Sequence, residues 1–127
     1  MNAGSAARAW VDAWERGWRD HDVEPIAAHY AEGAVFRSHP FRETEDPRAY
    51  VERVLAEEEA NPQVWFGEPI TDGDRAAVEY WAIIRYEGGD HTLAGTTLLR
   101  FDDDGLVIEH RDYWALEPGR RERPAPS

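Results

Sequence analysis

The sequence predicts an α+β fold in which three N-terminal helices pack on one face of a curved antiparallel sheet. Apolar residues recur at helical spacing up to about residue 60, whereas the rest of the chain consists of runs rich in β-branched and aromatic residues. The turn sequences TDGD, GGD and DDDG separate these runs, and turns this short join antiparallel strands. Because such a sheet must cover one face with the helices, a curled sheet would enclose a cone-shaped cavity beneath them.

The first helix is expected at about residues 4–19. Trp10, Trp14 and Trp18 recur at every fourth position, and charged residues occupy the opposite side. This stripe is typical of core packing, and the alternative is that one of the indoles lines a ligand cavity.

A second helix is expected after Asp22, which is a favourable N-cap residue, with Val23, Ile26 and Tyr30 on one face. Gly33 then ends this unit, and residues 34–38 form a short strand.

The third helix is expected to begin at Asp46 and Pro47. Asp46 is a good N-cap, and proline is tolerated at the first helical position because the missing N–H would be unpaired there anyway. The buried stripe of this helix consists of Tyr50, Val51, Val54 and Leu55. We expect the acidic run at 57–59 to be the solvated end of the helix rather than a metal site.

Four strand candidates follow, with the sequences QVWFGEPI, RAAVEYWAIIRYE, HTLAGTTLLRF and LVIEHRDYWAL. There is no internal repeat, so we expect a single domain over residues 1–117 and a disordered tail over 118–127.

The composition excludes several classes of function. A net charge of −12 over 127 residues disfavours binding to nucleic acid and to anionic membranes, and no apolar run is long enough to span a membrane. The chain has no Cys, and all 14 basic residues are Arg, which excludes thiolate chemistry and Schiff-base cofactors. The N-terminus has no signal-peptide pattern, so a cytoplasmic location is expected.

The alternation of side chains along a strand assigns the inward positions of the two longest candidates. In the last strand, the inward set is Leu106, Ile108, His110, Asp112, Trp114 and Leu116; in the strand that starts near residue 75, it is Val78, Tyr80, Ala82 and Ile84. A β-bulge would invert part of either assignment.

His39 and Asp112 are the candidate titratable groups. His39 precedes Pro40 at the end of the first strand, where it is either a turn residue or a pocket base, and Ser38 competes with it for the inward position. Asp112 is either a buried base or a structural residue paired with Arg111, Arg37 or a backbone N–H. No helical metal-ligand spacing occurs, so neither a metal nor another cofactor is expected.

The order of elements, together with the segments DVEPIAAHYAEGAVFRSHPF, DGDRAAVEYWA and FDDDGLVIEHRDYW, resembles the SnoaL-like group of the nuclear-transport-factor-2-like superfamily over about residues 5–116. The resemblance implies a cone-shaped fold with a pocket, in a superfamily that holds isomerases, cyclases, dehydratases, epoxide hydrolases and binding domains. It also implies an acid/base role for Asp112, which matches the late-strand aspartate of the cyclases. His39 stands near the pre-proline base of ketosteroid-isomerase-like members, with His instead of Asp and one extra residue before it.

We therefore expect His39, His110 and Asp112 to converge on one cavity, with Asp112 as the general base. The expected lining is Trp14, Tyr30, Trp65, Tyr80 and Trp114. The expected function is cofactor-free acid/base catalysis on a small, partly apolar molecule; the alternatives are a non-catalytic binding domain and an interaction module. A homodimer is expected through the outer sheet face, where Trp81, Ile83 and Tyr113 point outward.

Overall fold

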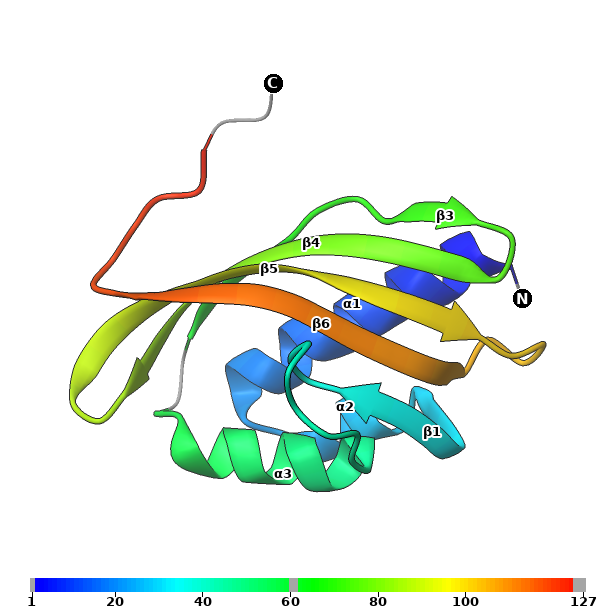
Figure 1. Ribbon diagram of the computed structural model, residues 1–127, viewed down its shortest axis with the longest axis horizontal. Coiled ribbons are helices and arrows are strands. Elements are labelled where there is room, and N and C mark those ends of the chain that lie inside the picture. Colours follow the sequence, from blue (N-terminus) through cyan, green and yellow to red (C-terminus); the bar gives the residue numbers. More distant parts are fainter. Residues whose placement is uncertain (1, 60–61, 125–127) are drawn as a thin grey trace.

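A computed structural model describes residues 2–59 and 62–124 of the chain. Its elements follow the order α1 (Ala3–Asp20), α2 (Val23–Ala27), β1 (Tyr30–Arg37), α3 (Pro47–Glu57), β2 (Gln63–Phe66), β3 (Ile70–Asp72), β4 (Arg75–Tyr86), β5 (Gly89–Phe101) and β6 (Val107–Pro118). The helices lie on one face of a strongly curved sheet, as Figure 1 shows. This confirms the predicted fold class, with three helices in the N-terminal half.

Helix α1 is bounded by local hydrogen bonds at both ends. The Asn2 side chain accepts the Ser5 N–H, and His21 ends the helix in the left-handed conformation with its N–H directed to the carbonyls of Gly17 and Trp18. At Gly17, an added Cβ would lie 2.6 Å from the Ile26 side chain. The glycine therefore allows α2 to approach α1 closely.

The second helix is shorter than expected. It ends at Ala27, and Tyr30 already belongs to β1, three residues before the glycine that was expected to separate helix from strand. Helix α3 begins as predicted, because the Asp46 side chain accepts the Ala49 N–H at 3.0 Å and Pro47 takes the first helical position.

The sheet is mixed rather than antiparallel, which corrects the prediction. Its strand order is β1-β6-β5-β4-β2, with β3 also paired to β4. Strands β4, β5 and β6 form the expected antiparallel meander, whereas β1 pairs with β6 in parallel. Short turns fix the direction only of consecutive strands. The pairing of β1 with β6 joins two distant parts of the chain, so no turn sequence reports its direction.

The expected strand QVWFGEPI is divided into β2 and β3, and both parts pair with β4. The division falls at Gly67, Glu68 and Pro69, and Pro69 has no N–H to donate to a ladder.

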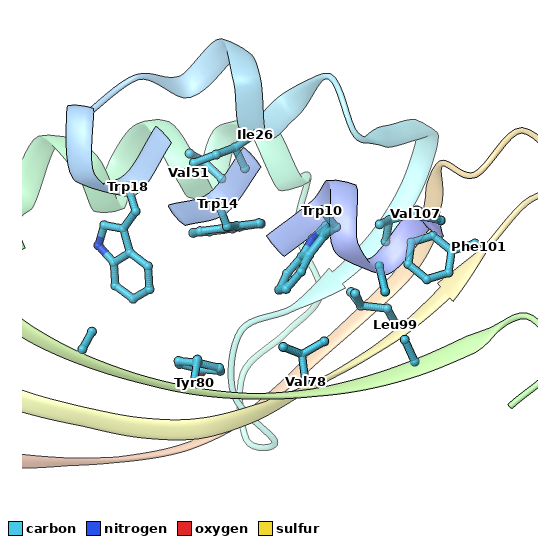
Figure 2. Packing of buried hydrophobic residues seen from close by; sticks show 14 of the residues in the cluster. Trp10, Trp14, Trp18, Ile26, Val51, Val78, Tyr80, Leu99, Phe101 and Val107 are labelled. Atoms are coloured by element: carbon cyan, nitrogen blue, oxygen red, sulfur yellow. The ribbon is translucent and has the colours of Figure 1, made fainter. Parts of the chain in front are cut away.

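The core lies between α1 and the concave face of the sheet. Figure 2 shows Trp10, Trp14 and Trp18 directed from α1 toward the strands, facing Val78 and Tyr80 of β4, while Ile26 and Val51 pack between the helices. The alternation predicted for β4 is confirmed, because Val78, Tyr80, Ala82 and Ile84 are all buried.

A bulge at the start of β6 overturns part of the alternation predicted for that strand. Val107 pairs with Phe101 and Glu109 with Arg100, so Ile108 is an extra residue in the ladder. Val107 is fully buried in the core, the place predicted for Leu106 and Ile108. After the bulge, His110, Asp112, Trp114 and Leu116 lie on the concave side as predicted.

The chain after β6 contacts the outer part of the sheet. The Arg121 N–H donates to Thr92 Oγ1 at 2.8 Å, Arg120 pairs with Asp90 at 3.2 Å, and the Arg123 guanidinium lies 3.8 Å from the Trp65 ring centroid. Residues 125–127 of the tail for which disorder is expected lie outside the described residues. Within the described part of the chain, no helix has the length and apolar character needed to cross a membrane.

Candidate functional site

A cavity of about 260 Å³ lies between the helices and the concave face of the sheet. Much of its wall is aromatic, with Trp10, Trp14 and Trp18 from α1, Tyr80 and Tyr86 from β4, and Trp114 from β6. The exposed residues Arg42 and Glu57 also line it, so the cavity opens to solvent. A polar group inside such a wall is largely removed from water and must find partners within the protein or in a ligand.

Asp112 is a carboxylate in this wall and is held by two neighbouring side chains. Its Oδ1 accepts hydrogen bonds from Thr97 Oγ1 at 2.6 Å and from His110 Nε2 at 2.7 Å. Thr97 is its directly paired residue on β5, and His110 precedes it by two positions on the same face of β6. Within residues 2–59 and 62–124, no arginine forms an ion pair with Asp112, so the structure does not show the pairing with Arg111 or Arg37 that was the alternative.

Behind His110 lies a second set of hydrogen bonds that fixes its tautomer. The Tyr30 hydroxyl lies 2.7 Å from His110 Nδ1, and the indole N–H groups of Trp10 and Trp14 point to the same hydroxyl at 3.1 and 3.0 Å. An indole nitrogen can only donate. The Tyr30 oxygen therefore accepts two hydrogen bonds, and its own O–H donates a hydrogen bond to His110 Nδ1. Nδ1 must then be the unprotonated ring nitrogen, so the ring proton of His110 is on Nε2, which faces Asp112.

Burial reinforces this assignment. His110 is 2 % exposed, and burial raises the pKa of Tyr30 far above its usual value, against the opposing effect of the two indole donors. The Tyr30 hydroxyl thus keeps its proton at any ordinary pH. The result is a connected chain of donors that runs from α1 through β1 to the Asp112 carboxylate on β6.

Two further tyrosines, Tyr50 and Tyr80, carry hydroxyl groups in the cavity wall. Burial, followed by the charge of Asp112, raises the pKa of both Tyr50 and Tyr80. Both side chains line the cavity, and within the described residues neither hydroxyl has a hydrogen-bond partner. These groups stay protonated and are available as donors to a ligand.

Glu58 is a second carboxylate in the wall and is only partly exposed, whereas the sequence analysis predicted a solvated helix end there. Burial raises its pKa to about 7, while the Trp18 Nε1 donor, which lies 2.8 Å from Oε1, acts in the opposite direction. Helical spacing carried the signal: Glu58 follows Val51 by seven positions and Val54 by four, so it extends the apolar stripe of α3.

Comparison with known proteins agrees with this architecture. The model of the SnoaL-like domain family matches residues 7–110 of the sequence. The chain belongs to the SnoaL-like domain family. No functionally curated protein matches the sequence significantly.

Three solved structures are similar to this chain in fold. An LEH-like epoxide hydrolase from Mycobacterium tuberculosis is 15% identical, with 88% of this chain and 84% of that chain covered and a TM-score of 0.71. The M. tuberculosis protein Rv0760c is 18% identical over 94% of this chain and 100% of its own, with a TM-score of 0.76. The epoxide hydrolase/cyclase-like enzyme SalBIII, described in pyran ring formation in the polyether salinomycin, is 14% identical over 91% and 96%, with a TM-score of 0.74. At these identities the likeness shows the fold alone.

The cavity of this SnoaL-like domain contains five of the eight residues expected there: Trp14, Tyr80, His110, Asp112 and Trp114. Tyr30 is not part of the wall, because its ring lies behind and stacks on His110 at a centroid distance of 5.9 Å. Trp65 is directly paired with Trp81, an outward residue of β4, so Trp65 faces outward and its neighbour Phe66 lines the cavity.

His39 does not converge with His110 and Asp112. Its Nδ1 accepts the Phe41 N–H at 3.3 Å, and its ring contacts Trp114 at a centroid distance of 4.8 Å, outside the cavity wall. Ser38 is fully buried instead and takes the inward position. The alternation of neighbouring residues along β1 is the reason, since Phe36 and Ser38 share the buried face.

Metal binding finds no support in the described residues, where no three His, Asp or Glu side chains gather closely enough to hold an ion.

Proposed function

We propose that this SnoaL-like protein is a cofactor-independent enzyme that performs general acid/base chemistry on a small, partly apolar organic molecule. The observation that carries the proposal is Asp112: a carboxylate in an aromatic cavity, oriented by Thr97 and His110 and without an arginine partner among the described residues. The epoxide hydrolase and cyclase-like enzymes among the structural neighbours support hydrolysis and cyclisation as reaction types, and the resemblance to the wider superfamily adds isomerisation and dehydration.

In this proposal Asp112 is the proton acceptor. Its Oδ1 already accepts two hydrogen bonds, which leaves Oδ2 to receive a proton from the substrate or from a water molecule that attacks it. When the proton comes from a C–H group beside a carbonyl, the C–H electron pair forms the C=C bond of an enolate and the carbonyl π pair moves onto its oxygen. When it comes from water, the hydroxide forms a bond to an epoxide carbon, and the C–O bond that breaks leaves its electron pair on the epoxide oxygen; the proton on Asp112 then returns to the product. The Tyr50 and Tyr80 hydroxyls, which have no protein partner among the described residues, donate hydrogen bonds to that developing charge.

His110 acts as a positioning residue in the same proposal. Its two ring nitrogens are both engaged, Nε2 with Asp112 and Nδ1 with Tyr30, so neither is free to contact a substrate. It holds the carboxylate in one rotamer, which is the geometric condition for efficient proton transfer. His39, which lies outside the wall, has no part in the chemistry.

The test compares the wild-type protein with Asp112→Asn, which is nearly isosteric. Two probe reactions cover the main classes: exchange of the acidic C–H protons of a cyclic ketone into deuterium oxide, followed by NMR, and hydrolysis of a small alicyclic epoxide. We expect catalysis of at least one probe, and a loss of about 10²–10⁴ in rate in the variant, with little change in melting temperature. Saturable binding of both probes without turnover would instead favour a non-catalytic binding domain.

We further propose a homodimer through the convex face of the sheet. Tyr113 of β6 is 43% exposed there, the partly buried Trp81 and Ile83 of β4 lie on the same face, and this face also carries charged side chains of both signs. Light scattering should give twice the monomer mass at micromolar concentration, and Tyr113→Asp should shift the mass to that of one chain. A monomeric wild-type protein would refute this proposal.

A further inference from the structure

Glu58 is a cavity carboxylate without a cationic partner among the described residues. The Trp18 indole satisfies one of its oxygens at 2.8 Å. The neighbouring arginine, Arg85, is engaged elsewhere, with Glu59 at 3.0 Å and with Asp90 at 3.2 Å. A partly buried carboxylate without a cationic partner is costly as an anion. Two events relieve that cost: uptake of a proton, or arrival of a cation from outside.

The surroundings of Glu58 are suited to the second event. The described lining contains three carboxylates, Glu57, Glu58 and Asp112, against one cation, Arg42. Arg42 itself contacts the Ser38 hydroxyl at 3.1 Å and lies over the Trp114 ring, 5.2 Å from its centroid. The electron-rich faces of aromatic rings attract organic cations, and most strongly where water is excluded.

We propose that the ligand of this cavity is an organic amine that binds as its ammonium ion, with the ammonium group on Glu58 and the apolar part along the tryptophan wall. This inference rests on one part of the proposed function, namely that the cavity binds a ligand. It adds the chemical class of that ligand. An ammonium ion supplies the charge that Glu58 lacks, and a carboxylate with one oxygen fixed by Trp18 presents the other to it.

The two carboxylates belong to one space. Both Asp112 and Glu58 contribute to raising the pKa of Tyr50, after the larger effect of its burial, so the Tyr50 hydroxyl lies within electrostatic reach of each. A ligand anchored on Glu58 therefore directs its far end toward the Tyr50 hydroxyl and Asp112.

The proposal has a definite pH dependence. Burial raises the pKa of Glu58 to about 7, so about one molecule in ten has the Glu58 anion at pH 6 and about nine in ten at pH 8. An alkylammonium ion stays charged at both pH values, so its affinity should rise about tenfold from pH 6 to pH 8. The other titratable or charged groups around Glu58 are Glu57, Glu59, Tyr50, Arg42, Tyr86, Arg85, His21, His91, His110 and Asp112.

The experiment measures binding by calorimetry and tryptophan fluorescence with two probes of equal size, 2-phenylethylamine and 2-phenylethanol. We expect the amine to bind the wild-type protein at least tenfold more tightly than the alcohol at pH 8, and the preference to shrink about tenfold at pH 6. In Glu58→Gln, the amine preference and its pH dependence should disappear, while alcohol affinity is kept. Glu52→Gln, which removes an exposed carboxylate of α3 outside the cavity wall, should keep both.

Equal affinities of the two probes for the wild-type protein, or no saturable amine binding, would overturn the inference. So would a pH dependence that survives in Glu58→Gln, because another group would then be its source. Since these measurements need no turnover, they are independent of the Asp112→Asn test. Amine selectivity without turnover would leave a binding domain, and turnover without amine selectivity would refute this inference alone.

Discussion

Replacing Glu58 by glutamine should stabilise the protein at alkaline pH and leave it almost unchanged in acid. The amide is close in shape to the protonated carboxyl group and can still accept the Trp18 N–H at the same place. Only the buried charge is removed. The difference in stability between the two proteins should therefore follow the ionisation of Glu58.

The size of the effect follows from the pKa. Burial raises the Glu58 pKa from its usual value of 4.5 to about 7, and the folded protein consequently holds its proton more tightly than the unfolded chain. A raised carboxyl pKa means that stability falls as pH increases from about 4.5 through 7. At about 1.4 kcal/mol per pH unit, the full loss in the wild-type protein is about 3 kcal/mol above pH 8. For a chain of 127 residues this corresponds to roughly 10 °C in melting temperature.

The assay is urea unfolding followed by circular dichroism at several pH values between 4.5 and 8.5, for the wild-type protein, Glu58→Gln and Glu57→Gln. The difference between the wild-type protein and Glu58→Gln should be near zero at pH 4.5 and reach about 3 kcal/mol in favour of the variant at pH 8.5. Glu57→Gln, at an exposed position, should show no comparable pH-dependent gain. A Glu58→Gln protein that is less stable at pH 8.5, or a difference that does not vary with pH, would refute the reasoning.

Three further substitutions test the hydrogen-bond chain from Tyr30 to Asp112, the position of His39 outside the site, and the packing of the sheet at Gly95. Tyr30→Phe removes the acceptor of two buried indoles and the donor to His110, and it should cost about 2–4 kcal/mol in urea unfolding; a cost below 0.5 kcal/mol would show that the chain contributes nothing. His39→Ala should change turnover by less than about twofold, because the side chain lies outside the cavity wall; a loss as large as that of Asp112→Asn would return His39 to the site. Gly95→Ala places a methyl group 2.5 Å from the Tyr113 carbonyl oxygen and should cost about 1–3 kcal/mol, whereas Gly89→Ala on the same strand, with its nearest atom at 3.9 Å, should not; equal melting temperatures for the two would refute the packing argument.

The features that sequence predicted correctly are those set by neighbours along the chain. The tryptophan spacing of α1 and the Asp46–Pro47 start of α3 depend on local geometry, and the alternation of β4 depends only on a regular strand. The inward direction of Asp112 followed from the same alternation, because β6 is regular from Glu109 onwards.

The features that sequence could not predict involve pairing between distant segments. The parallel contact of β1 with β6 leaves no local pattern, and the bulge at Ile108 is defined only by its partner strand. Trp65 was misplaced because the register of β2 against β4 decides its face. Glu58 is different, because its helical spacing from Val51 and Val54 indicates an inward position in the sequence itself. The prediction was wrong because Glu58 was taken together with Glu57 and Glu59 as one solvated acidic run.

The bulge at Ile108 divides β6 into two stretches with different structural roles. The residue before it, Val107, fills the core beside Phe101, and the residues after it carry His110 and Asp112 into the cavity. In a strand without a bulge, residues three positions apart point to opposite faces, so Val107 and His110 could not both face inward. Deleting Ile108 would force the strand to give up one of them. The extra residue thus reverses the facing of every later residue of β6, so that one strand supplies Val107 to the core and both His110 and Asp112 to the cavity.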